Sequence, residues 1–126
     1  MRGLLDTSVF IGQEQERDLA PLPDEAAISV MTLAELHVGV LLAAGPKVRA
    51  QRLRTLSRVE GTFDPLPVED SVARSFAEIA ADARRKRRHP RVVDALIAAT
   101  AVAHDLPLYS QDQDFALMPR VHLVLV

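Results

Sequence analysis

The chain has 126 residues, of which 48% are hydrophobic and 25% are charged, and it has no cysteine. These values are typical of one globular domain, here residues 1–126, and they exclude disulfides, a thiolate metal site and a cysteine nucleophile. The formal net charge of −2 conceals two basic segments, around positions 47–58 and 84–91. No secretory signal pattern opens the chain, and no apolar run approaches the roughly 20 residues that span a bilayer. We therefore expect a cytoplasmic protein that does not bind a membrane.

The first half of the chain predicts two short strands, each followed by helical sequence. One strand ends at Leu5, and a helix or turn begins at Ser8. The polar segment QEQERDLAPLPDE leads to a second strand, AAISV. Two helices follow. MTLAELHVGVLLAAGP stops at Gly45 and Pro46, and KVRAQRLRTLSRVEG, whose apolar residues have helical spacing, ends at Gly61.

The second half predicts two more helices and two more strands. TFDPLPV is extended, because its prolines cannot lie inside a helix. The amphipathic helix EDSVARSFAEIAADARRKRR precedes RVVDALIAATAVAHD, which is apolar almost all round, and LPLYS and VHLVLV are predicted as buried strands. Strands separated by helices predict a three-layer α/β/α fold with a central, mainly parallel sheet of about four to five strands. In such sheets, functional sites form beyond the carboxyl ends of the strands.

Four carboxylates interrupt apolar patterns at strand ends or early in helices. Asp6 follows the first strand, Glu35 lies one turn into a helix, Asp94 lies within VVDALI, and Asp112 follows the strand that ends at Tyr109. In a parallel sheet all four can point toward one edge, where they would repel one another, and no Lys or Arg stands immediately beside Asp6, Glu35 or Asp112 in the sequence. A divalent cation held by the four acids relieves this repulsion. With oxygen ligands and no cysteine, the metal is predicted to be Mg²⁺ or Mn²⁺.

Each acid also has a purely structural explanation. Residues 32–35 fit a helix capping box, Asp94 fits a first helical turn, and Asp6 and Asp112 fit helix or turn caps. These explanations do not account for the placement of all four acids together. Four neighbouring polar residues could orient the carboxylates or hold water, and each could equally be a simple backbone cap. They are Thr7, Ser8, Ser110 and Asp114.

The basic run RRKRRHPR ends one predicted helix just before Asp94. Arginine pairs with phosphate bidentately, and such a cluster attracts a phosphate backbone without reading its sequence. Alternatives are a solvated helix terminus, a nuclear-import signal or a patch for anionic membranes. The position beside the predicted cation site favours phosphodiester chemistry, with phosphate contacts from Arg84, Arg85, Arg87, Arg88 and Arg91.

Four segments resemble the motifs of PIN-domain nucleases, in order and across nearly the full chain: LLDTSVFI, SVMTLAELHVG, DALIAATA and LYSQDQDF. DALIAATA is the most specific match. The compact size and the arginine-rich stretch before DALIAATA resemble the VapC toxins of bacterial toxin–antitoxin pairs. Ser110 stands where family members commonly have Thr, and it keeps the hydroxyl group.

This resemblance implies a PIN-like fold and a Mg²⁺- or Mn²⁺-dependent endoribonuclease that uses metal-activated water. Asp6, Glu35, Asp94 and Asp112 match the acidic quartet of the family, and the arginines of the basic run would bind RNA. The resemblance also implies a homodimer, alone or within a larger toxin–antitoxin complex. A small antitoxin would inhibit it by covering the cleft with its C-terminal segment.

Other classes of protein fit less well. A phosphatase of the haloacid-dehalogenase type needs a second Asp where Ser8 stands, and a receiver domain needs an acidic pair before Asp6 and a late Lys. Nucleotide-cofactor binding lacks its glycine fingerprint, and a ribonuclease-H-like nuclease lacks its opening hairpins. The alternative that stays open is a non-catalytic RNA-binding or regulatory protein with the same fold, and metal-dependent turnover distinguishes the two.

Overall fold

The computed structural model describes residues 1–126. Its strands are β1 (Arg2–Leu5), β2 (Glu25–Ala27), β3 (Leu108–Ser110) and β4 (Leu123–Leu125). Its helices are α1 (Thr7–Glu14), α2 (Val30–Leu41), α3 (Pro46–Thr62), α4 (Asp70–Arg85), α5 (Val92–Ala103) and the short 3-10 helix η1 (Gln113–Leu117). Every strand and α-helix expected from the sequence is present, with ends shifted by a few residues. The sequence pattern did not predict η1.

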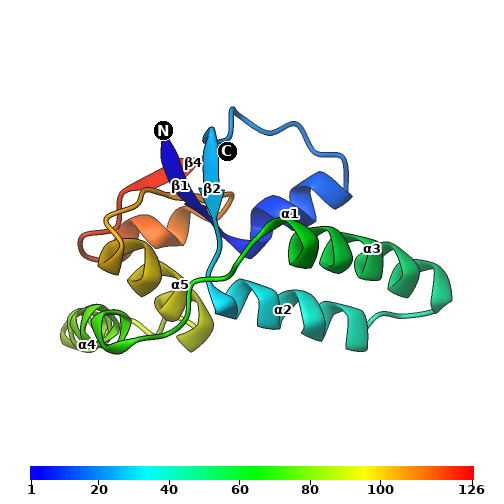
Figure 1. The fold of residues 1–126 in the computed structure, drawn as a ribbon. Helices are drawn as coiled ribbons and strands as arrows, with labels where there is room; N and C mark the ends of the chain where they lie inside the picture. Colours follow the sequence, from blue (N-terminus) through cyan, green and yellow to red (C-terminus); the bar gives the residue numbers. More distant parts are fainter.

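The four strands form one parallel sheet in the order β2-β1-β3-β4, as Figure 1 shows in part. In the central pairing, Leu5 of β1 lies opposite Tyr109 of β3. The prediction of a parallel central sheet is therefore confirmed, with four strands. The extended segment after α3 adds one parallel bridge between Ser29 and Leu66, so it lies beside the start of α2.

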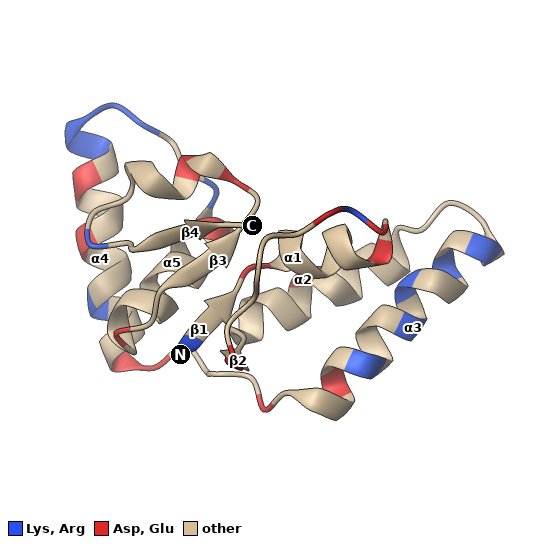
Figure 2. Ribbon diagram, turned by 90° about the horizontal axis from the view of Figure 1, so that it is seen from above, with Lys and Arg blue, Asp and Glu red and all other residues tan.

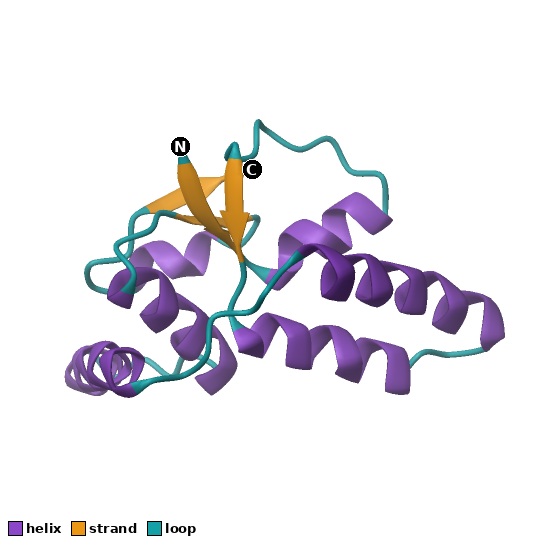
Figure 3. Ribbon diagram, in the orientation of Figure 1, coloured by secondary structure: helices purple, strands orange, loops and turns teal.

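Helices cover both faces of the sheet. Figures 1 and 3 show α1, α2 and α3 on one side and α4 and α5 on the other. Neighbouring residues of β1 point to opposite faces, as the alternation of a strand requires. Leu4 packs in a cluster with α4 and α5, whereas Leu5 packs in a second cluster with α1, α2 and α3. The three-layer prediction is confirmed by these two separate cores.

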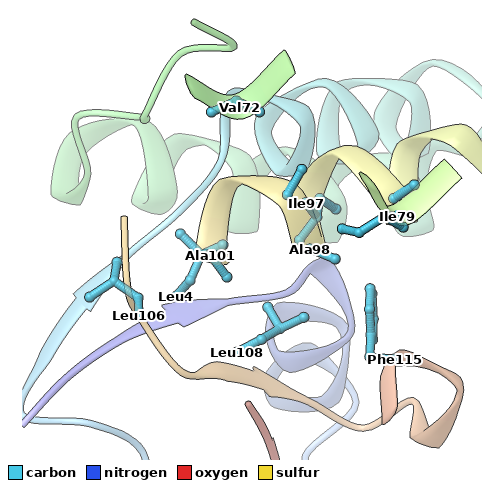
Figure 4. Close-up of a cluster of buried hydrophobic side chains, with 11 residues drawn as sticks. Leu4, Val72, Ile79, Ile97, Ala98, Ala101, Leu106, Leu108 and Phe115 are labelled. Atoms are coloured by element: carbon cyan, nitrogen blue, oxygen red, sulfur yellow. The ribbon is translucent and has the colours of Figure 1, made fainter. Parts of the chain in front are cut away.

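The helix α5 lies between the sheet and α4, which explains why its sequence is apolar almost all round. Five consecutive positions from Ile97 to Ala101 are almost fully buried. Figure 4 shows Ile97, Ala98 and Ala101 of α5 packed with Leu4 and Leu108 of the sheet. Small alanine side chains let the helix approach its neighbours closely, and this fixes the position of the residues in its first turn. No helix is both long and apolar enough to cross a membrane.

Gly3 provides a test of the packing between β1 and β3. A Cβ atom at this position would lie 2.6 Å from Cδ1 of the buried Tyr109 ring. We expect Gly3→Ala to lower the free energy of unfolding by about 1–3 kcal/mol, because the ring must shift within a filled core. The matched control is Gly61→Ala, where a Cβ atom would meet nothing within 4 Å. Because Gly61 lies in α3, that change should stabilise the protein by up to about 1 kcal/mol. Urea unfolding of both variants measures the difference, and equal midpoints would contradict the account.

Candidate functional site

Three carboxylates meet at the carboxyl edge of the sheet. Asp6 follows β1, Glu35 lies in the second turn of α2, and Asp94 lies in the first turn of α5. One carboxylate oxygen of each lies within 4.8 Å of the others. Asp6 is only 4% exposed, and the side chains of Glu35 and Asp94 are each 20% exposed. The fold thus concentrates negative charge in a largely buried position.

Two serine hydroxyls hold Asp6. Its Oδ2 accepts hydrogen bonds from Ser8 Oγ and Ser110 Oγ, each at 2.8 Å, and a longer one from the Ser8 amide at 3.4 Å. All three of these bonds go to Oδ2. Burial raises the pKa of Asp6 above its ordinary value, against these hydrogen bonds and one from the Thr7 backbone, which lower it. A carboxylate oriented in this way is suited to binding a cation.

Glu35 is held from both sides. Thr7 Oγ1 donates to Oε1 at 2.6 Å, and Arg91 Nη2 donates to Oε2 at 3.0 Å. The capping box considered for residues 32–35 is not formed, because α2 begins earlier and Ser29 is its cap, accepting from the Met31 amide at 3.0 Å. The capping explanation for Glu35 is therefore wrong. Its side chain is directed by tertiary contacts.

Arg91 lies beside two of the three acids. Besides Glu35, its Nη1 lies 3.7 Å from Asp94 Oδ1. Burial raises the pKa of Asp94, Arg91 lowers it, and the charges of Asp6, Glu35 and Asp112 raise it further. Arg91 is thus a cation close to the acids in space, although no Lys or Arg is directly adjacent to Asp6, Glu35 or Asp112 in the sequence. One guanidinium, 67% exposed, cannot neutralise three carboxylates.

Asp112 and Asp114 lie outside the group of three. Asp112 is exposed, and its Oδ1 accepts from the Asp114 amide at 2.9 Å at the start of η1, while its own amide donates to Ser110 Oγ. Asp114 is exposed within η1. Of the four predicted acids, the structure therefore brings three together and leaves Asp112 at the margin, where its charge still raises the pKa of Asp94.

The acids lie between two cavities. A cavity of about 480 Å³ is lined by Asp94, Asp112 and Asp114 together with Arg88 and Arg91. On the other side, a cavity of about 160 Å³ is lined by residues of α1, α2 and α3, among them Thr7, Glu35, Arg52 and Thr55. A chain molecule that crosses the acids could therefore contact the protein on both sides.

The predicted arginines divide into two groups. Arg88 and Arg91 line the larger cavity, whereas Arg84, Arg85 and Arg87 are exposed around the end of α4 and do not line it. Figure 2 shows this basic end of α4 and a second basic stripe along α3. The stripe was visible in the sequence as a run of basic residues without an acid, but it was not assigned a role. Its members are Lys47, Arg49, Arg52, Arg54 and Arg58.

Comparison with known proteins identifies the family. The model of the PIN domain matches residues 3–121. The chain belongs to the PIN-domain family. It is 48% identical to Ribonuclease VapC5 of Mycobacterium tuberculosis over 92% of this chain and 87% of that protein, and 40% identical to Ribonuclease VapC4 of the same organism over 99% and 97%.

A solved structure supports the same assignment. The crystal structure of VapBC-5, a member of the VapBC family of toxin–antitoxin systems from M. tuberculosis, matches with a TM-score of 0.84 and 44% identity, over 99% of this chain and 97% of that one. The resemblance to PIN domains of the VapC type, which the four motifs indicated, is confirmed.

The raised pKa of Asp6 predicts how stability depends on pH. The folded protein holds this proton more tightly than the unfolded chain does, so the associated stability is complete below the ordinary pKa of 3.8 and is lost as pH rises through the higher folded value. In EDTA at neutral pH, Asp6→Asn should therefore be more stable than the parent, and the difference should shrink on acidification. Urea unfolding at several pH values measures it. Asp18→Asn is the matched control, because Asp18 is exposed in a loop and is not one of the acids of the site. An Asp6→Asn variant with the parent's pH dependence would contradict the prediction.

Proposed function

We propose that this protein is a Mg²⁺- or Mn²⁺-dependent endoribonuclease and the toxin of a toxin–antitoxin pair. The observation that carries the proposal is the group of three carboxylates within 4.8 Å of one another in a PIN domain. The names of the relatives, Ribonuclease VapC5 and VapC4, support RNA as the substrate. The cytoplasm is the proposed place of action, and residues 1–126 the proposed nuclease domain.

The donor set fits a hard divalent cation. Asp6, Glu35 and Asp94 offer carboxylate oxygens, and no sulfur or imidazole ligand belongs to the group. Both serine hydroxyls donate to Oδ2 of Asp6, so neither of them occupies Oδ1. We assign the metal to these three acids, with Asp112 as a fourth acid near the substrate. When bound, the cation would lower the pKa of a water molecule that it holds and would stabilise negative charge on the phosphate.

The hydroxyl groups of the site orient its acids. Thr7 fixes Glu35, while Ser8 and Ser110 fix Asp6. The protons of both serine hydroxyls are engaged by Asp6, and Ser110 is fully buried. Full burial keeps Ser110 from reaching a substrate as a nucleophile. The proposed role of all three residues is to hold the carboxylates in one orientation before the substrate arrives.

The arginines supply the attraction for RNA. Arg88 and Arg91 line the cavity that opens from Asp94, so they are suited to contact the phosphates next to the scissile bond. Arg84, Arg85 and Arg87 at the end of α4 extend this positive charge over the surface. Binding through such contacts weakens steeply with salt.

The proposed partners follow from the named relatives. The solved VapBC-5 structure belongs to a toxin–antitoxin system, and the likeness extends over 99% of this chain. We therefore propose a small cognate antitoxin as inhibitor and a homodimer, alone or within a larger toxin–antitoxin complex.

Cleavage of RNA tests the proposal. Purified protein, free of antitoxin, is incubated with total cellular RNA and Mg²⁺ or Mn²⁺, with and without EDTA. We expect discrete fragments that disappear in EDTA and decline at least about 100-fold in Asp94→Asn, because the carboxylate helps to hold the cation. Asp18→Asn, a change at an exposed loop position, is the matched control and should cleave normally. RNA binding without any metal-dependent cleavage would instead support the non-catalytic alternative.

The contacts of Arg91 predict its effect on metal affinity. Its guanidinium pairs with Glu35 and Asp94, two of the proposed ligands. Arg91→Ala should bind Mn²⁺ about two- to fivefold more tightly, since an exposed ion pair contributes about 1 kcal/mol or less. Calorimetric titration measures this, with Arg91→Lys as the charge-preserving control. Weaker binding by Arg91→Ala would mean that Arg91 positions Glu35 for the metal.

A further inference from the structure

We infer that the larger cavity, between α4, the start of α5 and η1, is a subsite that encloses one nucleobase of the RNA next to the scissile phosphate. The inference rests on the proposed function and goes beyond it, because it assigns base selection to residues that do not hold the metal. Four observations carry it: the position of the cavity, the chemistry of its wall, the lack of exposed Phe, Tyr or Trp side chains elsewhere, and the contact made by Arg88.

The position of the cavity makes it continuous with the acids. Asp94, one of the three clustered carboxylates, and the nearby Asp112 both line it. A phosphate held at the acids therefore has its neighbouring nucleotide at the entrance to this cavity. The cavity volume of about 480 Å³ falls within the range of small-molecule sites, about 300–1,000 Å³.

The wall is suited to a flat apolar ring with polar edges. Ile79 and Ala83 of α4 and Phe115 of η1 line the cavity and are almost fully buried. Leu117 lines it too and is 50% exposed, so an apolar side chain remains open to a ligand. Arg88 and His89 bring positive and polar groups to the same space. Apolar walls with a few polar groups are typical of sites that take small organic rings.

The rest of the surface offers no aromatic platform. Proteins that bind single-stranded RNA commonly stack bases on exposed aromatic side chains. This chain has no Trp, and no aromatic residue is among its exposed large hydrophobic side chains. Aliphatic walls, the plane of an arginine and an exposed histidine are other means of holding a base, and the larger cavity combines all three in Leu117, Arg88 and His89.

Arg88 links the two sides of the cavity. Its amide donates to Ala83 O at 2.7 Å, which fixes the turn after α4, and its Nη1 donates to Leu117 O at 3.3 Å in η1. The guanidinium plane is thereby placed between the turn and η1. Arg88 makes no contact with the three clustered acids, so its effect on base selection is separable from metal binding.

The test uses an RNA oligonucleotide that spans a cleavage site found in total RNA. Intact oligonucleotide is compared with versions that carry an abasic ribose at one position beside the cut. We expect one abasic position to lower kcat/KM about tenfold or more in the parent protein, because a base held by stacking is lost. Leu117→Trp, which fills the cavity at an exposed position, and Arg88→Ala should lose most of this discrimination. Leu117→Trp should cut the abasic RNA as the parent does, whereas Arg88→Ala, which also loses a proposed phosphate contact, should slow the intact RNA more than the abasic RNA. Both variants should bind Mn²⁺ normally.

Matched controls are Leu125→Trp and Arg74→Ala, both exposed and outside the cavity, which should keep the parent's discrimination. If no abasic position matters, or if the variants slow intact and abasic RNA equally, the subsite is overturned while the nuclease stands. If the parent protein cuts no RNA with either metal, the proposed function fails and the subsite fails with it.

Discussion

Mutual repulsion among Asp6, Glu35 and Asp94 is the constraint that determines how the surrounding side chains of the site are arranged. Carboxylates within 4.8 Å of one another, one of them almost fully buried, destabilise a folded chain unless their charge is compensated. The parallel sheet creates the problem, because its strand order brings the end of β1 next to the helices that follow β2 and precede β3. Burial is the first cause of the raised pKa of both Asp6 and Asp94, and for Asp94 the charges of Asp6 and Glu35 raise the pKa further.

Three hydroxyl groups and one arginine side chain partly compensate this repulsion. Ser8 and Ser110 donate to one oxygen of Asp6, and Thr7 donates to Glu35, so the acids are oriented by neutral groups that add no competing charge. Arg91 adds a positive charge from the exposed side, where a long side chain can move at little cost. Without a cation, the exposed guanidinium of Arg91 offsets part of the negative charge. The hydroxyl groups keep the carboxylates oriented, so the same site can accept a cation when Arg91 moves aside.

The sequence predicted the layers well because its signals there are local. Short apolar runs separated by helical spacing led to the four strands, and the apolar circumference of α5 predicted a helix buried between sheet and α4. Two features could not be predicted from the sequence, because they depend on contacts between distant parts of the chain. The contact between Arg91 and Glu35 joins residues 56 apart in the sequence. Asp112 caps η1 and is not part of the group of three acids, although its position after β3 suggested that it would join them.

The fold separates the chemistry from the contacts that could select a substrate. The acids lie at the ends of core elements: Asp6 directly follows a buried strand, and Asp94 is carried by a helix with five consecutive almost fully buried positions. Arg88 and Leu117, by contrast, lie in a turn and at the end of the short helix η1, and both of these side chains are exposed. Substitutions at exposed positions of this kind usually change stability by about 0.5 kcal/mol or less. Arg88 and Leu117 can therefore change the larger cavity while the three acids keep their positions.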